Sequence, residues 1–199
     1  LYIAFVDYRP LQGIWGSAFV GLENFKAFFA TNNWITVTGN TLFLNVLFIA
    51  ATTITSVAIA IMLAEISNKW VKKITQSIVI LPHFMSWTIV SMLSVAILSA
   101  NGVVNQLITM VGGKTIEFYN TPSVWPAILV ILKVWQGAGF GSIVYLATIT
   151  GIDASIYEAA AVDGASKTQC IFKVTLPMLK NTIIMLTIMS VGKIFNGDF

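Results

Sequence analysis

Long apolar stretches alternate with short polar segments along the 199 residues of the chain. About 20 apolar residues are enough to cross the hydrocarbon core of a bilayer as an α-helix. Three stretches reach that length, and two shorter ones flank them. We therefore predict the end of a first span at 1–8, full spans at 41–64, 74–98 and 123–150, and the start of a fifth at 182–195.

The segment between the first two predicted spans, residues 9–40, is more polar. It contains the amphipathic stretch GLENFKAFF, which we interpret as an interfacial helix with its phenylalanines turned toward lipid. Trp34 follows this stretch, and tryptophan is enriched at the level of the lipid headgroups. We expect the segment to rest on the membrane surface.

Composition supports a membrane protein, because 57% of the residues are hydrophobic and only 10% are charged, against about 25% charged in soluble domains. No basic run indicates nucleic-acid binding. The lone Cys170 excludes an internal disulfide, and with His83 as the one histidine we predict no metal site. One membrane domain over 1–199 is the economical interpretation. The chain opens in an apolar run, LYIAFVDY, and ends equally abruptly at KIFNGDF, so we expect further membrane segments at both ends.

Lysine placement predicts which loops face the cytoplasm, where short loops retain Lys and Arg. The loop 65–73 and the loop 151–181 fall on one side if the spans are counted as above. Those two loops hold Lys69, Lys72, Lys73, Lys167, Lys173 and Lys180, whereas the opposite side holds only Arg9, Lys26 and Lys114. The loop 151–181 is therefore predicted to be cytoplasmic.

The loop 151–181 carries helix start and stop signals. Ser155 and Glu158 fit a capping box that starts a helix over about 156–163. Gly164 then stands where a left-handed residue ends a helix. A second box, Ser166 to Gln169, restarts a helix toward Val174, and Pro177 kinks or interrupts the chain.

Two interpretations of this helix, turn and helix are open at this point. Capping boxes and C-terminal glycines are common, so the residues fit an ordinary loop joining two membrane helices. Alternatively, Ala159, Ala160 and Ala161 make the first helix slim enough to enter a groove on a partner.

The spacing in the loop resembles a known signature. Glu158-Ala159-Ala160, three residues, Gly164, nine residues and Val174-Thr-Leu176-Pro177 are similar to the E-A-A…G…I-x-L-P pattern of ATP-binding-cassette importer permeases, with valine for isoleucine. In that family the loop docks into a cleft of the ATPase subunit. The resemblance implies this coupling role for Tyr157, Glu158, Ala159, Ala160, Asp163, Gly164, Leu176 and Pro177.

The resemblance extends along nearly the whole chain, through WQGAGFGSIVYLATITGID, LPHFMSWTIV and KIFNGDF. These stretches look like the branch of permeases that imports polysaccharides and oligosaccharides, similar to the lipoprotein-polysaccharide and alginate-oligosaccharide permeases. The resemblance implies an all-α bundle of the type I importer kind, with six spans in the full chain, in the plasma membrane of a prokaryote. It also implies a second related permease, two ATPase subunits that bind ATP and Mg²⁺, and an extracytoplasmic sugar-binding protein.

A sugar pathway through lipid needs inward hydrogen-bonding groups and aromatic faces, because unsatisfied polar groups are costly there. For each candidate, helix packing or the interfacial belt is the alternative, and Lys133 could instead extend toward the headgroups. The candidates for the pathway are Phe84, Trp87, Lys133, Trp135, Gln136, Tyr145, Lys193 and Asn196.

The chain contains no G-x-x-x-x-G-K-[ST] loop, so we predict a transport subunit with no ATPase site and no cofactor of its own. The rival is a gradient-driven secondary transporter of a small polar solute. Ion coupling usually needs acidic residues inside the membrane, and none of the three full-length apolar stretches contains one. A membrane enzyme ranks last, because the chain has neither H-E-x-x-H nor G-x-S-x-G.

Overall fold

A computed structural model describes residues 2–31 and 33–194. The chain divides into two compact units, 1–43 and 44–199, and each is described by itself. The first unit contains the 3₁₀-helix η1 (Tyr2–Phe5), β1 (Val6–Asp7), α1 (Gly13–Gly16), β2 (Ala18–Phe19) and α2 (Glu23–Ala30). The strands β1 and β2 pair antiparallel, with Val6 opposite Phe19.

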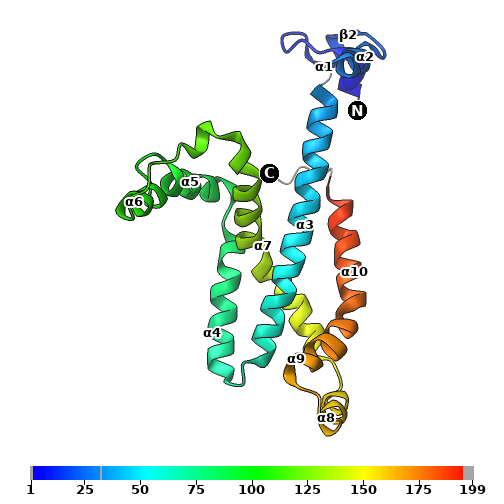
Figure 1. Ribbon diagram of the computed structural model, residues 1–199. Helices are drawn as coiled ribbons and strands as arrows, with labels where there is room; N and C mark the ends of the chain where they lie inside the picture. The colour runs from blue at the N-terminus through cyan, green and yellow to red at the C-terminus, as the bar shows by residue number, and fades with distance from the viewer. Residues whose placement is uncertain (1, 32, 195–199) are drawn as a thin grey trace. The chain divides into compact units, whose positions relative to one another are not determined.

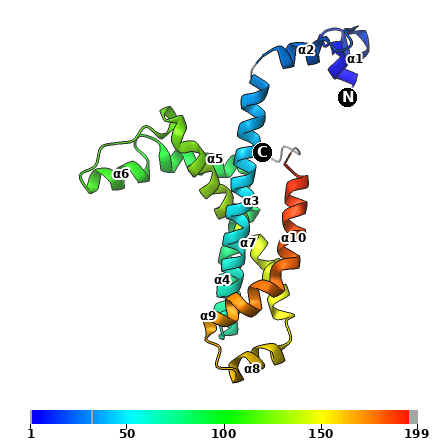
Figure 2. The same cartoon turned by 45° about the vertical axis from the view of Figure 1, so that its right-hand side comes forward.

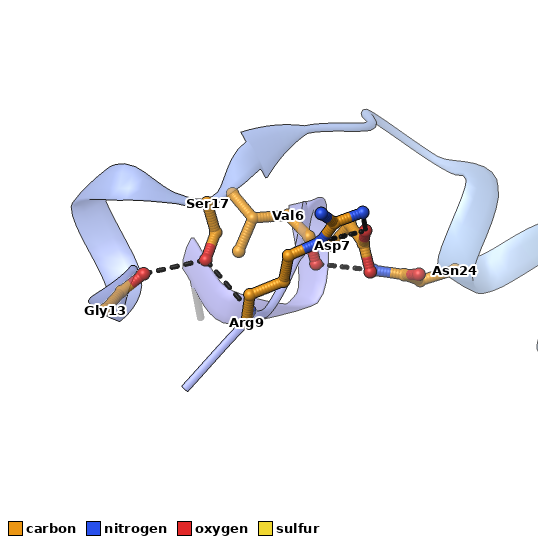
Figure 3. Close-up of polar contacts among 6 residues, drawn as sticks. All are labelled: Val6, Asp7, Arg9, Gly13, Ser17 and Asn24. Atoms are coloured by element: carbon orange, nitrogen blue, oxygen red, sulfur yellow. Dashed lines mark hydrogen bonds and ion pairs between the residues drawn. The ribbon is translucent and has the colours of Figure 1, made fainter. Parts of the chain in front are cut away.

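Short-range polar contacts hold the first unit together (Figure 3). Asn24 donates from Nδ2 to the carbonyl oxygens of Ala4 and Val6, at 3.1 and 3.0 Å. Ser17 Oγ accepts from the Arg9 N–H at 3.1 Å and donates to the Gly13 carbonyl at 2.7 Å. These side chains form hydrogen bonds with backbone groups that have no strand partner in so small a sheet.

The predicted end of a first span at 1–8 is wrong over its described part. Residues 2–5 form a 3₁₀-helix and residues 6–7 a two-residue strand, and Val6 is 1% exposed within this small fold. A mostly apolar stretch this short cannot by itself distinguish a helix end from a buried strand. The helix predicted in GLENFKAFF is present as α2, and its place at the membrane surface stays a prediction.

The second predicted span is a helix that is longer than expected. Helix α3 (Asn33–Glu65) begins eight residues before Thr41, because the residues from Trp34 to Asn40 include only one glycine and no proline to stop it. It ends at Glu65, one residue beyond the predicted end.

The second unit consists of helices joined by turns and by a longer loop between α6 and α7 (Figure 1). After the α3 segment from residue 44 come α4 (Lys69–Ile80), the 3₁₀-helix η2 (Leu81–Phe84), α5 (Trp87–Leu98), α6 (Val103–Met110), the 3₁₀-helices η3 (Phe118–Asn120) and η4 (Pro122–Val124), α7 (Trp125–Thr150), α8 (Ala154–Val162), α9 (Lys167–Cys170), the π-helix η5 (Ile171–Thr175) and α10 (Leu176–Gly192). Four helical stretches of the described residues are long and apolar enough to cross a membrane: Asn33–Glu65, Trp87–Met110, Pro122–Thr150 and Lys167–Gly192.

The third predicted span, 74–98, is not one helix. It is divided into α4 and α5 by η2, which contains Pro82. Proline lacks the N–H that the helix ladder needs, so α4 ends at Ile80. Ser86 then caps α5 by accepting the N–H of Ile89 at 3.4 Å. Helix α6 was also not predicted.

The fourth and fifth spans have shifted boundaries. Helix α7 begins at Trp125 and ends at Thr150, which confirms the prediction of 123–150. Helix α10 begins at Leu176, six residues before the expected Thr182, and its described part ends at Gly192. The predicted end of this span, Phe195, lies outside the described residues.

The core of the second unit lies where α3, α7 and α10 meet. Its members are all buried, with 0–8% exposure: Val57, Ala60 and Leu63 from α3, Tyr145, Leu146 and Ile149 from α7, and Leu179 from α10. The hydroxyl of Ser56 donates to the carbonyl of Ala138 at 3.0 Å, which links α3 directly to the backbone of α7.

Two glycines let α7 approach its neighbours on opposite sides. A Cβ atom on Gly139 would lie 1.9 Å from the carbonyl oxygen of Val79 in α4. A Cβ on Gly141 would lie 2.6 Å from Oγ of Ser56 in α3. Small residues at such crossings allow the close packing that joins helices in a membrane.

A buried amide organises the segment after α5. Asn105 in α6 is 1% exposed, and its Nδ2 donates to the carbonyls of Ser99 and Ile116, both at 3.0 Å. Its Oδ1 accepts the N–H of Ile116 at 2.8 Å. One side chain thus holds both the end of α5 and the return segment.

We expect Gly139→Ala to destabilise the protein, because the new methyl group would overlap the Val79 carbonyl and force α7 from α4. Overpacking of this kind costs about 1–3 kcal/mol. Gly137→Ala is the matched control, since its Cβ would meet Thr52 Cγ2 at an ordinary 3.7 Å. Thermal unfolding in detergent should show a lower midpoint for Gly139→Ala alone; equal midpoints for both variants would contradict the close contact.

Candidate functional site

Helix α8 forms most of the polar loop after α7 (Figure 2). Its N-terminal cap is Asp153, whose Oδ1 accepts the N–H of Ser155 at 2.9 Å. The predicted cap at Ser155 is therefore wrong, because Asp153 provides the cap two residues earlier and the helix begins at Ala154. This N–H lowers the pKa of Asp153, so the charged cap is complete above the usual range of aspartate and weakens as pH falls below it.

The C-terminus of α8 ends as predicted. Gly164 has φ +74°, a left-handed conformation that favours glycine. Its N–H donates to the Ala161 carbonyl at 3.0 Å, and the N–H of Ala165 donates to the Ala160 carbonyl at 2.9 Å. This pair of bonds is the Schellman motif, which satisfies the last carbonyls of a helix and reverses the chain.

The second capping box is confirmed. Ser166 Oγ accepts the N–H of Gln169 at 3.3 Å, and Gln169 Oε1 accepts the N–H of Ser166 at 2.8 Å. The short α9 that follows continues through the π-helix into α10, and Figure 2 shows the direction changing there. Pro177 lacks an N–H and crowds the preceding turn, which accounts for the interruption of regular α-helix before it.

The two sides of α8 differ in exposure. Ser155, Glu158, Ala159 and Val162 are exposed, and their spacing of three or four residues places them on one face. Val162, the last residue of α8, is 88% exposed. We call these four residues the outer face of α8. On the other side, the side chain of Tyr157 is half-buried.

Two polar contacts attach the loop to the membrane helices. The hydroxyls of Tyr157 and Thr175 lie 3.0 Å apart, which ties α8 to the end of the π-helix. Lys167 Nζ lies 3.5 Å from a carboxylate oxygen of Glu65, at the end of α3. The Lys167–Glu65 pair is exposed, so it contributes little stability.

A cleft of about 450 Å³ lies between the loop and the ends of α3 and α7. Its lining is mixed, with Ala161, Lys167 and Cys170 from the loop and Ile61 and Ile149 from the membrane helices. Helix α8 is therefore held beside the bundle by few contacts and is not buried in it.

The structure separates the residues of the predicted coupling signature. Glu158, Ala159, Asp163 and Gly164 are exposed, whereas Ala160 is half-buried. Leu176 packs against the core cluster of α3, α7 and α10, and Pro177 is exposed at the first turn of α10. Tyr157 connects the two parts through Thr175. The coupling role of all these residues stays a prediction.

Three of the pathway candidates lie together where α7 faces the start of α5. Lys133 Nζ lies 5.2 Å from the centre of the Trp87 ring, a cation–π contact that stabilises a cation away from water. One turn along, Gln136 Nε2 donates to the Met85 carbonyl at 3.1 Å. Both contacts also fit helix packing, so the pathway role stays a prediction.

The other pathway candidates are dispersed. Phe84 is 77% exposed, and Trp135 contributes to an apolar groove between α5 and α7. Tyr145 is 2% exposed and belongs to the core cluster. Lys193 is exposed at the C-cap of α10, and Asn196 lies outside the described residues.

Sequence reasoning missed Thr175, which lies within the signature but is 5% exposed and bonded to Tyr157. No periodicity indicates this pairing, because the two residues are 18 positions apart on separate helices. It also missed Asp153, although aspartate just before a helix is a cap signal that could have been weighed against Ser155. The sequence did not indicate the role of Ser56, since its hydrogen-bond partner is a backbone carbonyl.

Several apolar helices that pack through glycines, with a capped polar helix outside them, define a polytopic membrane protein. Residues 56–197 match a family described as the binding-protein-dependent transport system inner membrane component. Because this match covers more than half of the chain, the protein belongs to that family. It is a multi-pass protein with the fold of type I importer permeases.

The similar proteins include a polygalacturonan/rhamnogalacturonan permease and an alginate transporter. The chain is 37% identical over 193 residues to the polygalacturonan/rhamnogalacturonan transport system permease YteP of Bacillus subtilis, covering 96% of this chain and 60% of the relative. It is 34% identical to protein LplB of the same organism, covering 99% and 62%. A crystal structure of a bacterial alginate transporter, in complex with an alginate pentasaccharide-bound periplasmic protein, superposes with a TM-score of 0.84 at 36% identity, covering 89% and 62%. The chain thus spans about three fifths of the length of these proteins.

We expect Gly164→Val to loosen the end of α8, because a β-branched residue is strained at φ +74° although nothing lies within 4 Å of the new Cβ. The left-handed conformation costs an ordinary residue about 1–2 kcal/mol. Gly164→Asn is the control, since asparagine tolerates this conformation. Amide hydrogen exchange should accelerate at residues 164 and 165 in the valine variant and change less in the asparagine variant; equal protection in both would contradict the Schellman cap.

Proposed function

We propose that this protein is a permease subunit of an ATP-driven importer for oligosaccharides or polysaccharide fragments. It forms half of the translocation pathway and is coupled to a separate ATPase by α8. Family membership supports a permease, and the names of the relatives support the sugar class.

The observation that carries this proposal is the outer face of α8. A helix of nine residues lies in the polar loop, with Asp153 capping its start and Gly164 its end. Because both ends are satisfied locally, the helix keeps its shape without being buried. Its outer face leaves Glu158 and Val162 available to a partner, and a helix in a groove is a common mode of recognition.

The partners follow from the same proposal. An ATPase pair binds ATP and Mg²⁺, since this chain has no phosphate-binding loop. A second related permease completes the pathway, and an extracytoplasmic binding protein delivers the sugar. Closure of the ATPase pair moves α8, and the membrane helices expose the sugar site alternately to the two sides.

The substrate pathway is proposed to include the contact between Lys133 and Trp87 and the neighbouring Gln136. Aromatic faces stack on pyranose rings, and amide and ammonium groups donate to sugar oxygens. A lysine within a membrane span is costly unless it faces a partner or a cavity, which favours function at Lys133. The further candidates for the substrate pathway are Phe84, Trp135, Tyr145, Lys193 and Asn196.

The test is reconstitution of the protein with its neighbouring permease and an ATPase subunit in liposomes. ATP hydrolysis and sugar uptake are measured with and without sugar-loaded binding protein, over oligosaccharides derived from pectin and alginate. We expect hydrolysis to rise when the loaded binding protein is present. If no ATPase associates and an ion gradient alone drives uptake, the protein is instead a secondary transporter.

We expect Val162→Asp to reduce stimulated hydrolysis and uptake by about ten-fold or more, because a charge at this exposed apolar position of the outer face opposes burial against a partner. Thr168→Asp is the matched control: it adds the same charge to the same loop, but on exposed α9. Equal loss in both variants would mean that the charge of the loop matters and the outer face does not.

A further inference from the structure

We propose that Thr175 and the π-helix Ile171–Thr175 form the link through which movement of α8 reaches α10. Thr175 is a positioning residue, which acts through Tyr157 and not by contact with the sugar or ATP. This inference rests on the proposed function, because it assigns the internal route of the same coupling.

The contact between Tyr157 and Thr175 is isolated. Among the described residues, the hydrogen bond between Tyr157 and Thr175 is the one side-chain hydrogen bond that joins α8 to a membrane helix. A cleft of about 450 Å³ lies beside this contact and is lined by Tyr157 and Ala161 of α8. A displacement of α8 therefore acts on the bundle chiefly at this hydroxyl pair and at the chain connections.

The direction of the hydrogen bond between Tyr157 and Thr175 follows from a second contact of Thr175. Thr175 Oγ1 also lies 3.4 Å from the carbonyl oxygen of Cys170, which can only accept. When Thr175 donates its one hydroxyl proton to that carbonyl, the Tyr157 hydroxyl donates to Thr175. The chain of bonds then runs from α8 through Thr175 to the backbone at the start of the π-helix. Because Thr175 is 5% exposed, water competes little for these groups.

The hydrogen bond from Tyr157 ends on a residue of the π-helix. A π-turn within an α-helix is rare and is often found at functional sites. Here it ends two residues before Pro177, which cannot supply the backbone bond that would stiffen the next turn. The segment between Cys170 and Leu176 is thus the place where the direction of the helix can change at least cost.

The π-helix is directly followed by residues that pack in the core of the second unit. Leu176 packs against the core cluster directly after Thr175, and Leu179, one turn later, is 0% exposed. These leucines meet Leu63 of α3 and Tyr145 of α7 in the same cluster. A tilt at the π-helix is therefore passed to both helices that pack against α10.

The experiment compares Tyr157→Phe, Thr175→Val, the double variant and Thr175→Ser in the reconstituted complex. The quantity measured is the ratio of sugar transported to ATP hydrolysed. We expect the ratio to fall roughly three- to ten-fold in each of the first two variants, as for the loss of one hydrogen bond. The double variant should be no worse than the single ones, because both remove the same bond. Thr175→Ser keeps the hydroxyl and should restore the ratio.

The outcomes separate this inference from the proposed function. If the wild-type complex forms and transports, but both single variants keep its ratio, Thr175 is not the link. Additive losses in the double variant would equally overturn the inference, since the two hydroxyls would then act independently. A loss in Thr175→Ser as large as in Thr175→Val would show that packing matters and the hydroxyl does not. Absence of any ATPase association would overturn the proposed function itself.

Discussion

The close approach of α7 to its neighbours is the constraint on which the second unit depends. Helices in lipid gain little from burying apolar side chains, because the surrounding hydrocarbon is equally apolar. Their association therefore rests on backbone contact and on polar bonds between helices. Gly139 places α7 against the backbone of α4, and the bond from Ser56 to Ala138 places it against α3. The core around Leu63 and Leu179 forms where this packing continues toward α10.

The loop that contains α8 is stabilised in a different way from the membrane helices. It has few buried side chains, so its conformation depends on local backbone satisfaction at Asp153, Gly164 and Ser166. Each of these residues supplies bonds that the helix ends lack. A segment built in this way keeps its form while leaving one face open. That property fits the proposed docking of α8 on a partner protein.

The sequence predicted the parts that depend on composition and local chemistry. The span over 123–150, the reversal at Gly164 and the box from Ser166 to Gln169 follow from apolar length, backbone freedom and capping, which act within a few residues. The break at Pro82 was missed, because an apolar stretch of the right length outweighed its one proline. The pairing of Tyr157 with Thr175 could not be predicted, since it depends on how two helices fold back on each other.

The two contacts of the loop differ in what they can transmit. Lys167 and Glu65 meet at an exposed surface with long flexible side chains, so their charges can follow a movement without passing on force. Tyr157 and Thr175 meet where the threonine is buried, and its hydroxyl is bonded a second time to the backbone. The rigid ring of the tyrosine spans the distance with only two rotatable bonds. In the proposed coupling, force applied to the outer face of α8 is therefore directed preferentially to the π-helix and α10, while the ion pair with α3 follows that movement.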